Sequence, residues 1–364
     1  MKFFISGYYG FDNAGDEAVL EAMLQALGER APAGSEYIVT SGNPSRTAAR
    51  YSGGPWRVRP IGRQGPAELA RAIAGCDVFL SGGGSLLQDV TSLRNVVYYT
   101  TLMRVAKLCG KPVMVYAQGV GPLRSPKARK LTRLVMQAAA VVTLRDTDSL
   151  DLLRQIGVRR ACEVTADPVL ALRPEALAEP RPVEGTWLVN LRPWSPSGPG
   201  ESADAPLDQV AQAIVATART HGARLRFLPM QPETDGPLCR GLQEENGDAG
   251  LDSCVATEGF GPSRIMAEAG RGELMIAMRL HALIFAAVQG LPCVAINYDP
   301  KVAALAKLMG MPLVEAREAG ELGVWMRAVA AAKRPPEELL HDLKNKALRN
   351  ADLAVGLGTR KSKA

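Results

Sequence analysis

The chain opens on the stretch Lys2-Phe3-Phe4-Ile5-Ser6-Gly7-Tyr8-Tyr9-Gly10-Phe11-Asp12-Asn13-Ala14-Gly15-Asp16-Glu17, which decides the fold. Residues 2–6 form a short apolar run that predicts a strand, and glycines follow it where the backbone has to turn. Residues 16–29 carry the spacing of an amphipathic helix. A strand, a glycine-rich turn and a helix in this order are typical of a βαβ unit on a parallel sheet.

The same alternation continues through the first half of the chain. Short β-rich runs again precede amphipathic segments, as expected for strands that are buried between layers of helices. The expected further strands are 36–40, 77–81, 112–117 and 140–144, and the expected helices are 66–74, 96–108, 127–138 and 147–156.

A proline-rich stretch at 173–182 separates this half from a second series of strands and helices. In that half we expect strands at 186–191, 224–230, 274–277 and 294–296, and helices at 206–220, 264–270, 282–289 and 302–309. The chain is therefore expected to form an α/β fold of two Rossmann-like lobes with a cleft between them. The expected divisions are an N-terminal lobe at 1–172, a hinge at 173–185, a C-terminal lobe at 186–345 and a basic helix or tail at 346–364.

Composition indicates a globular cytoplasmic protein. The chain has 364 residues, of which 47% are hydrophobic, and no apolar run reaches the roughly 18 residues of a membrane span. Its N-terminus lacks the apolar core and cleavage site of a signal peptide. The cysteines form no CxxC pair, so we expect reduced thiols and no structural zinc. They are Cys76, Cys109, Cys162, Cys239, Cys254 and Cys293.

The net charge is +6, and two stretches carry visible basic excess. The first contains Arg46, Arg50, Arg57, Arg59, Arg63 and Arg71, and the second contains Arg349, Arg360, Lys361 and Lys363. One interpretation is a solvated basic surface. The other is attraction to an anionic membrane or to a diphosphate-bearing substrate. Nucleic acid is not expected, because only 5% of residues are aromatic and no recognition motif is present.

Glycines and polar residues follow several predicted strands. The turn at 7–17 matches neither the dinucleotide fingerprint G-x-G-x-x-G nor a P-loop. Asn13 or Asp16 can cap the helix, or can contact a ligand at its N-terminus. The glycines at 82–84 expose backbone N–H groups that suit an anion, although they also suit close packing. Gln118 begins a similar turn after the strand at 112–117.

In the second half, Arg279 and His281 stand two residues apart before an apolar run. Arginine is a permanent cation whose planar fork fits carboxylate and phosphate, and histidine exchanges a proton near neutral pH. Arg192 directly follows the strand expected at 186–191. Arg192 and Arg279 together suit a molecule that bears both a carboxylate and a phosphate. The alternative is a helix start with an incidental basic pair.

The chain resembles the polysaccharide pyruvyl transferase family, and most closely its CsaB-type members, from Phe3 to about Leu308. The motifs that carry the resemblance are Gly10-x-x-Asn13-x-Gly15-Asp16, Gly82-Gly83-Gly84, Gln118-Gly-x-Gly121-Pro122 and Arg279-Leu280-His281. The resemblance implies a fold like that of GT-B glycosyltransferases. It also implies that phosphoenolpyruvate is a co-substrate and that a cyclic pyruvate ketal is formed on a sugar, with no further cofactor.

For CsaB-type enzymes, the implied acceptor is N-acetylmannosamine in an undecaprenyl-diphosphate-linked ManNAc-GlcNAc precursor of a secondary cell-wall polymer. The finished ketal then anchors surface-layer proteins. The family's phosphoenolpyruvate-binding residues correspond to Arg192, Arg279, Leu280 and His281. His281 is the expected general acid and Asp16 the expected base, with Arg279 stabilising the departing phosphate. Candidate acceptor-binding residues are Asn13, Asp16, Gly83, Gly84 and Gln118, and no metal is expected.

Two other functions are compatible with a two-lobe architecture. A nucleotide-sugar glycosyltransferase would bind UDP or GDP in the second lobe. A non-catalytic, periplasmic-binding-like receptor would need an export signal and would leave the Arg279–His281 pair without a purpose. The expected location of the pyruvyltransferase is the cytoplasm, with peripheral contact at the inner face of the cell membrane.

Overall fold

The computed structural model describes residues 1–90, 92–177, 183–194, 204–245, 251–255 and 257–361, so part of the predicted hinge (178–182) and the end of the basic tail, with Lys363, lie outside the described residues. The chain divides into two compact units. The first unit consists of Met1–Phe11, Asp16–Leu172 and Asp342–Ala364, and the second of Asp12–Gly15 and Arg173–His341.

The first unit is built on an entirely parallel sheet with the strand order β3-β2-β1-β4-β6-β7-β8, and a short further strand, β5, pairs with β6. Its strands are β1 (Lys2–Tyr9), β2 (Glu36–Ser41), β3 (Arg57–Gly62), β4 (Val78–Ser81), β5 (Gly84–Leu87), β6 (Val113–Val120), β7 (Val141–Leu144) and β8 (Glu163–Val164). The strand order reverses direction between β1 and β4, and ligands of open α/β sheets bind beyond the strand ends at such a point.

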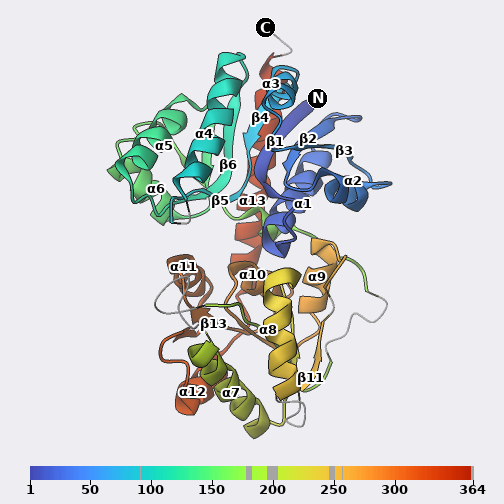
Figure 1. Cartoon of the computed structure of the whole chain (residues 1–364), viewed down its shortest axis with the longest axis vertical. Coiled ribbons are helices and arrows are strands. Elements are labelled where there is room, and N and C mark those ends of the chain that lie inside the picture. Colours follow the sequence, from blue (N-terminus) through green and yellow to red (C-terminus); the bar gives the residue numbers. More distant parts are fainter. Residues whose placement is uncertain (91, 178–182, 195–203, 246–250, 256, 362–364) are drawn as a thin grey trace. The chain divides into compact units, whose positions relative to one another are not determined.

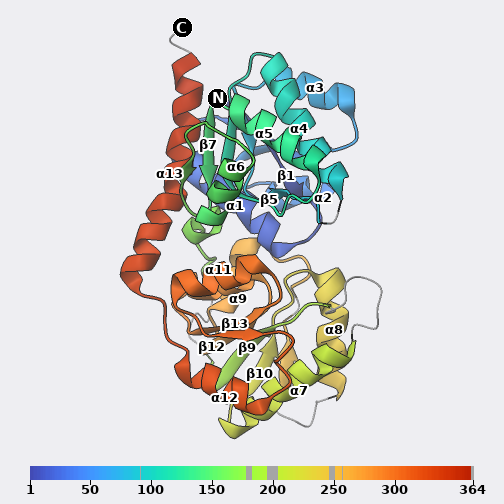
Figure 2. The same ribbon diagram turned by 90° about the vertical axis from the view of Figure 1, so that its left-hand side faces the viewer.

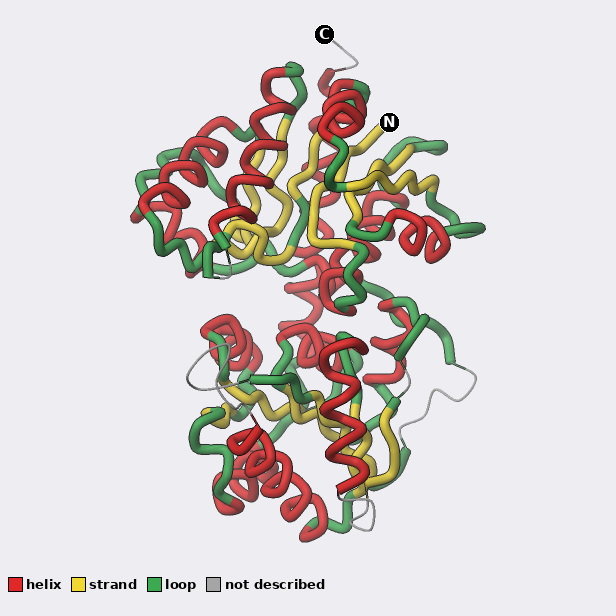
Figure 3. Tube along the Cα trace, viewed as in Figure 1, coloured by secondary structure: helices red, strands yellow, loops and turns green. Residues whose placement is uncertain are grey.

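Helices cover both faces of this sheet, as Figures 1 and 3 show. They are α1 (Ala14–Gly28), α2 (Pro44–Tyr51), α3 (Pro66–Ala74), α4 (Leu93–Leu108), α5 (Pro126–Ala138), α6 (Thr147–Gln155) and a short 3-10 helix, η1 (Pro168–Ala171). Phe4 and Phe79 stack at 5.1 Å between ring centroids within a core to which the strands and helices α3 to α6 contribute. Burial of this apolar surface is the main force that holds the layers together.

The second unit repeats the plan with a six-stranded parallel sheet in the order β11-β10-β9-β12-β13-β14. Its strands are β9 (Thr186–Asn190), β10 (Arg224–Phe227), β11 (Leu251–Cys254), β12 (Leu274–Ala277), β13 (Cys293–Asn297) and β14 (Leu313–Glu315). Its helices are α7 (Asp204–Thr220), α8 (Pro232–Glu245), α9 (Pro262–Ala269), α10 (Leu280–Val288), α11 (Pro300–Met309) and α12 (Leu322–Ala331). Trp325 is fully buried in the core of this unit.

The long helix α13 (Glu337–Lys361) begins in the second unit, and from Asp342 onward it belongs to the first. In the first unit it runs beside β7 and α1 (Figure 2). Arg349 pairs with Glu163 at 3.2 Å, and Asn350 accepts a hydrogen bond from the Thr165 hydroxyl at 3.0 Å. No helix in the described parts of the chain is both long enough and apolar enough to cross a membrane.

Capping side chains explain where many helices begin. Ser92, Ser125, Asp146 and Asp299 each accept a hydrogen bond from a backbone N–H in the first turn of the helix that follows. Such caps satisfy donors that have no partner within the helix. Asn43 does the same before Pro44, so α2 starts in a segment where the sequence predicted no helix.

The predicted α/β architecture of two Rossmann-like folds is confirmed, and most predicted elements are present within a few residues. The basic stretch 46–71 was not expected to contain α2 and β3, and the segment after β10 was not expected to form α8. Helix α1 begins at Ala14, two residues before the predicted start, because the Asn13 carboxamide accepts a hydrogen bond from the Gly15 N–H at 3.1 Å.

Candidate functional site

In the second unit, the side chain of Asn190 ties together three neighbouring strand ends. Asn190 is fully buried at the end of β9; its Nδ2 donates to the Leu228 carbonyl at 2.9 Å, and its Oδ1 accepts from the Arg279 N–H at 3.1 Å. Because β10, β9 and β12 are parallel neighbours, their carboxyl ends meet at one edge of the sheet. The Asn190 side chain therefore holds the backbone of Arg279 in place.

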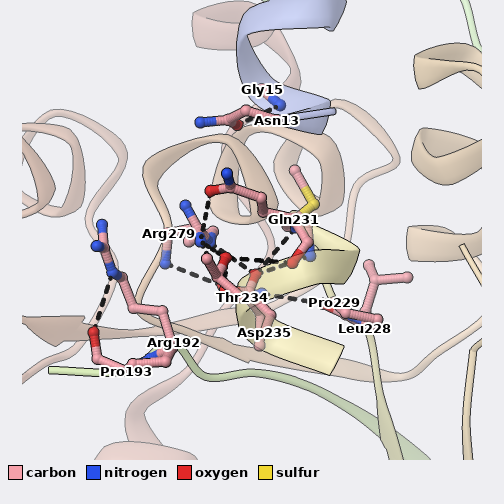
Figure 4. A network of polar contacts seen from close by, with 12 residues as sticks. Asn13, Gly15, Arg192, Pro193, Leu228, Pro229, Gln231, Thr234, Asp235 and Arg279 are labelled. Atoms are coloured by element: carbon pink, nitrogen blue, oxygen red, sulfur yellow. Dashed lines mark hydrogen bonds and ion pairs between the residues drawn. The ribbon is translucent and has the colours of Figure 1, made fainter. Parts of the chain in front are cut away.

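The guanidinium of Arg279 forms a bidentate ion pair with Asp235. Its Nε and Nη2 donate to the two carboxylate oxygens at 2.7 and 2.5 Å, and Nη2 also lies 3.3 Å from the Gln231 carboxamide oxygen (Figure 4). Asp235 is fully buried near the start of α8, where it also accepts from the N–H groups of Met230 and Gln231. These four donors compensate the cost of burying the carboxylate.

This pairing leaves one edge of the Arg279 guanidinium available. The fork has five N–H donors, and those on Nε and Nη2 are directed toward Asp235, Gln231 and Thr234. Among the described residues, none accepts from Nη1. The side chain is 10% exposed, so its position is set by the ion pair while Nη1 can donate to an anion.

Helix α10 starts directly after Arg279, which occupies the N-cap position without a side-chain cap. The backbone N–H groups at the start of a helix, here beginning with Leu280, lack intrahelical acceptors and attract anions. His281 is the next residue and is partly buried. The first turn of α10 thus adds backbone donors and an imidazole to the cation that precedes it.

The start of α1 lies against His281. An added Cβ at Gly15 would come within 2.2 Å of His281 Nδ1 and 2.7 Å of its Cγ, so a larger residue here would force the imidazole to move. The Ala14 N–H also donates to the Met230 carbonyl at 2.8 Å, which fixes the segment Asp12–Gly15 within the second unit. The motif around Asn13 and Gly15 and the motif around His281, which are remote in sequence, are therefore in contact.

Arg192 lies beside Tyr298 at the ends of β9 and β13. Its Cζ is 5.3 Å from the centre of the Tyr298 ring, and its Nη1 is 3.4 Å from the tyrosine hydroxyl. Arg192 makes no ion pair with the described residues. Figure 4 shows its guanidinium on the same side of the strand ends as that of Arg279, separate from the Asp235 network.

In the first unit, Glu17 organises the turn after β1. It is 2% exposed; one carboxylate oxygen accepts from the Gly10 N–H at 2.6 Å and the other lies 2.8 Å from Arg50 Nη1. Burial raises the pKa of Glu17 above its ordinary value, and Arg50 and the backbone N–H groups partly oppose that rise. Gly10 has a φ of +80°, which glycine adopts without strain.

The glycines at 82–84 pack closely against neighbouring elements. Side chains are disfavoured at Gly83 by a close contact and at Gly84 by its backbone conformation. A Cβ at Gly83 would approach a methyl group of Val19 to 2.8 Å. Gly84 has a φ of +90°, and a Cβ there would lie 3.4 Å from Asp16 Oδ1. The Asp16 carboxylate is therefore located at the glycine loop, beyond the ends of β1 and β4.

Gln118 is placed by an irregularity in β6. Ala117 has a φ of +45°, which is unusual for a residue with a Cβ, and the register with β7 shifts at this point. The fully buried Gln118 side chain then donates to the Ser81 hydroxyl at 2.8 Å and to the Gly82 carbonyl at 2.9 Å. Its amide nitrogen thus fixes the glycine loop, while no described residue bonds its Oε1.

A buried ion pair supports the same loop from the side of β7. Arg145 donates to Asp167 at 3.1 Å and to the Ser85 hydroxyl at 2.9 Å, and its side chain is 7% exposed. It also lies 3.4 Å from its neighbour Asp146, the local pairing that its sequence position suggests. Gly119 leaves the space that the Arg145 guanidinium occupies.

The sequence alone predicted neither the Asp235–Arg279 pair nor the Arg145–Asp167 pair. Arg145 directly follows β7, and Asp235 lies in the first turn of α8. A buried arginine requires an acidic partner, which was the available signal. Among the described residues, no three His, Cys, Asp or Glu side chains are gathered in the manner of a metal site.

A family model for polysaccharide pyruvyl transferases matches residues 13–300. The chain belongs to the polysaccharide pyruvyl transferase family. The match includes Asn13, the glycine loop and the Arg279–His281 segment, and therefore spans both units. A search of curated protein sequences finds no match.

Solved structures show that this pyruvyl transferase family member has a GT-B type fold. UDP-GlcNAc 2-epimerase from Methanocaldococcus jannaschii is 14% identical with a TM-score of 0.64, covering 97% of this chain and 99% of its own. A putative UDP-N-acetylglucosamine 2-epimerase from Listeria monocytogenes is 10% identical with a TM-score of 0.62, covering 100% and 97%. A glycosyltransferase from Rickettsia africae is 11% identical with a TM-score of 0.52, covering 99% and 96%. At these identities the similarity concerns the fold alone.

Proposed function

We propose that the protein transfers the pyruvyl group of phosphoenolpyruvate to two hydroxyls of a sugar, forming a cyclic ketal and releasing phosphate. The observation that carries this proposal is the anion site at the start of α10. There, an arginine held by Asp235 keeps one edge available, a helix N-terminus offers backbone donors, and His281 follows at once. A substrate with a carboxylate and a phosphate that needs a proton during reaction matches these three features.

The chemistry assigns a step to each group. His281, as an imidazolium, protonates the methylene carbon of phosphoenolpyruvate, which leaves an oxocarbenium-like centre at the carbon that bears the phosphate. One sugar hydroxyl attacks that centre and loses its proton to a base, for which Asp16 is the candidate. The second hydroxyl then attacks the same carbon and passes its proton to the now neutral His281 imidazole, and the ring closes as phosphate leaves. Arg279 stabilises the negative charge of the departing phosphate through Nη1.

The remaining predicted residues have supporting roles in the proposal. Arg192 binds the second anionic group of phosphoenolpyruvate, because its guanidinium has no ion pair among the described residues. Leu280 contributes its backbone N–H. Asn13, Gly83 and Gly84 contact the acceptor sugar.

Gln118 has a more restricted role. Its nitrogen already bonds Ser81 and Gly82, and its side chain is fully buried, so its oxygen would accept from a sugar hydroxyl only if the glycine loop moved aside.

We also propose that the acceptor is that of CsaB-type enzymes. It would be N-acetylmannosamine in an undecaprenyl-diphosphate-linked precursor of a secondary cell-wall polymer, and the ketal would serve to anchor surface-layer proteins. Such an acceptor is presented at the inner face of the cell membrane, where the basic stretches would provide peripheral electrostatic attraction. The resemblance in the motifs supports this acceptor.

The acid role of His281 is tested by comparing H281Q with H341Q. His341 is exposed at the start of α13 and has no part in the proposed chemistry. H281Q should lower the turnover of phosphoenolpyruvate about 100-fold or more, the usual contribution of a general acid, while H341Q should leave it unchanged. Near-normal turnover by H281Q would show that another group delivers the proton. Binding of UDP or GDP by a protein that does not bind phosphoenolpyruvate would contradict the proposed reaction itself.

A further inference from the structure

One arginine of the first unit lies among four aromatic rings. Arg63 Cζ is 4.6 Å from the ring centre of Tyr98, 5.4 Å from Phe11, 5.6 Å from Tyr99 and 5.8 Å from Tyr8. Tyr8 and Phe11 stack on each other at 4.2 Å, and Tyr98 and Tyr99 meet edge to face at 5.1 Å. We call these five residues the Arg63 cluster. Cation–π attraction holds the guanidinium in place without neutralising its charge.

The Arg63 cluster lies at the ligand-binding end of the first sheet. Arg63 directly follows β3, Tyr8 is near the end of β1, and Tyr98 and Tyr99 are in the second turn of α4, which packs beside β5 and β6. Because all these strands are parallel, the cluster and the loop at 82–84 share the carboxyl edge of the sheet.

The charges of Asp16, the candidate base, and of Arg63 act on the same tyrosine hydroxyls. Burial raises the pKa of the Tyr8 hydroxyl, the negative charge of Asp16 raises it further, and the positive charge of Arg63 lowers it. Burial likewise raises the pKa of the Tyr99 hydroxyl, which the charge of Arg63 lowers and that of Asp16 raises. Asp16 and Arg63 therefore both lie within electrostatic range of the same rings.

Arg63 differs from Arg50 and Arg59 of the basic stretch in its lack of an acidic partner among the described residues. Arg50 pairs with Glu17 at 2.8 Å and Arg59 with Glu36 at 3.0 Å. Within the described parts of the chain, Arg63 forms no ion pair, and its one hydrogen bond runs from Nη2 to the Tyr99 hydroxyl at 3.3 Å. No described residue accepts from its Nε. A partly buried guanidinium in this state suits an anion that comes from outside the chain.

Apolar side chains are exposed in the cluster and on the segment that carries Tyr98 and Tyr99. Tyr8 is 37% exposed, as is Val97 beside Tyr98 in α4, and Val90 shortly before α4 is 47% exposed. Exposed aromatic surface beside an unneutralised arginine suits a ligand that joins an anionic group to a sugar ring.

We infer that the Arg63 cluster binds the diphosphate of the acceptor, with the exposed face of Tyr8 against the adjoining sugar. This inference rests on the proposed function, because it takes a diphosphate-linked sugar to be the acceptor. It assigns a substrate contact to a residue outside every family motif in the sequence. Phosphate rather than carboxylate is favoured because diphosphate oxygens accept from several edges of one guanidinium.

The test uses two soluble forms of one acceptor disaccharide, so that no membrane takes part. One form carries a short alkyl diphosphate, and the other is an alkyl glycoside without phosphate. Binding of each form is measured by calorimetry, and transfer from phosphoenolpyruvate is measured separately. The variants are R63M, R63K and the control R57M, whose arginine is exposed on β3.

R63M should bind the diphosphate form about 10- to 100-fold more weakly, the range expected for loss of charge-assisted hydrogen bonds, and should bind the glycoside as the wild type does. R63K, which keeps the charge without the fork, should lose less, and R57M should lose nothing. Equal loss on both forms would mean that Arg63 only supports the fold, and unchanged binding of the diphosphate form would exclude the contact. Both results overturn the inference. Diphosphate-dependent binding without transfer by the wild type would instead contradict the proposed function and leave the Arg63 assignment supported.

Discussion

Replacing Asp235 by asparagine tests whether activity depends on the position of the Arg279 guanidinium, because the variant keeps the arginine and removes its charged partner. The substitution keeps the size of the side chain but removes the charge that holds Nε and Nη2 at 2.7 and 2.5 Å. Asp235 is fully buried and the Arg279 side chain is 10% exposed. Breaking one side of such a pair leaves an uncompensated buried charge, which costs about 3–5 kcal/mol of unfolding free energy.

The expected consequence in D235N is a lower melting temperature and a misplaced guanidinium. A loss of about 3–5 kcal/mol corresponds to a fall of roughly 6–20 °C for a domain of this size. Misplacement by about 1 Å costs on the order of 100-fold in rate, so kcat/KM for phosphoenolpyruvate should fall by about that factor. Urea unfolding and steady-state kinetics measure the two effects independently.

A double-mutant cycle refines the prediction. In D235N/R279Q neither charge is buried, so the double variant should be more stable than the sum of the single losses predicts, by at least about 1.5 kcal/mol. The control D342N removes an exposed ion pair, in which the Lys346 side chain is 49% exposed and that of Asp342 is 54% exposed. Its loss should cost under about 1 kcal/mol. Additive losses in the cycle, or a D235N cost no larger than that of D342N, would refute the claim that Asp235 holds Arg279.

Three further results are expected. G15A should lower activity strongly, because its Cβ would lie 2.2 Å from His281 Nδ1 and the imidazole would have to move. G356A in α13, with no atom near its added Cβ, should stabilise the fold by up to about 1 kcal/mol without loss of activity, and equal activity of the two variants would contradict the contact. Burial raises the pKa of Glu17 above 4.5, so the native state binds the proton of this carboxyl more tightly than the unfolded state does. The protonated carboxyl therefore contributes stability below about pH 4.5, and this contribution is lost as the pH rises through the native pKa. E17Q should therefore gain stability relative to the wild type as the pH rises above about 4.5, and a relative loss in urea unfolding over that rise would show the sign to be wrong. Flotation with anionic vesicles should occur at about 0.05 M salt and fail near 0.5 M, and flotation that ignores salt, or its absence, would count against electrostatic attraction.

Local sequence patterns were sufficient to predict most of the architecture. The apolar run at 2–6, the glycine turn and the helix after it are specified by neighbouring residues. The same holds for strands β9, β10, β12 and β13 of the second unit, whereas β11 and β14 were not predicted. Helix α2 was missed because its apolar face is small, although Asn43 followed by Pro44 is a start signal. Strand β3 was missed because arginines alternate along it and obscure its pattern.

The candidate site was only partly predictable, because its partners are set by tertiary contacts. Asp235 stands 44 residues from Arg279 in sequence, and nothing local to either residue identifies the pair. Gln118 was expected to face the acceptor, but which atoms it offers depends on the left-handed backbone at Ala117. Gly15 was predicted as part of a turn and cap, whereas its contact with His281 becomes visible only when the second unit is folded.

The most direct test of the proposed reaction is phosphate release from phosphoenolpyruvate, with and without an undecaprenyl-diphosphate-linked ManNAc-GlcNAc acceptor, followed by the mass of the product. The account predicts acceptor-dependent release and a product heavier by the mass of phosphoenolpyruvate minus phosphoric acid. Release with a galactose-type glycan but not with this acceptor would retain the chemistry and reject the proposed acceptor. No release with any sugar, together with binding of UDP or GDP, would contradict pyruvyl transfer as the activity of this protein.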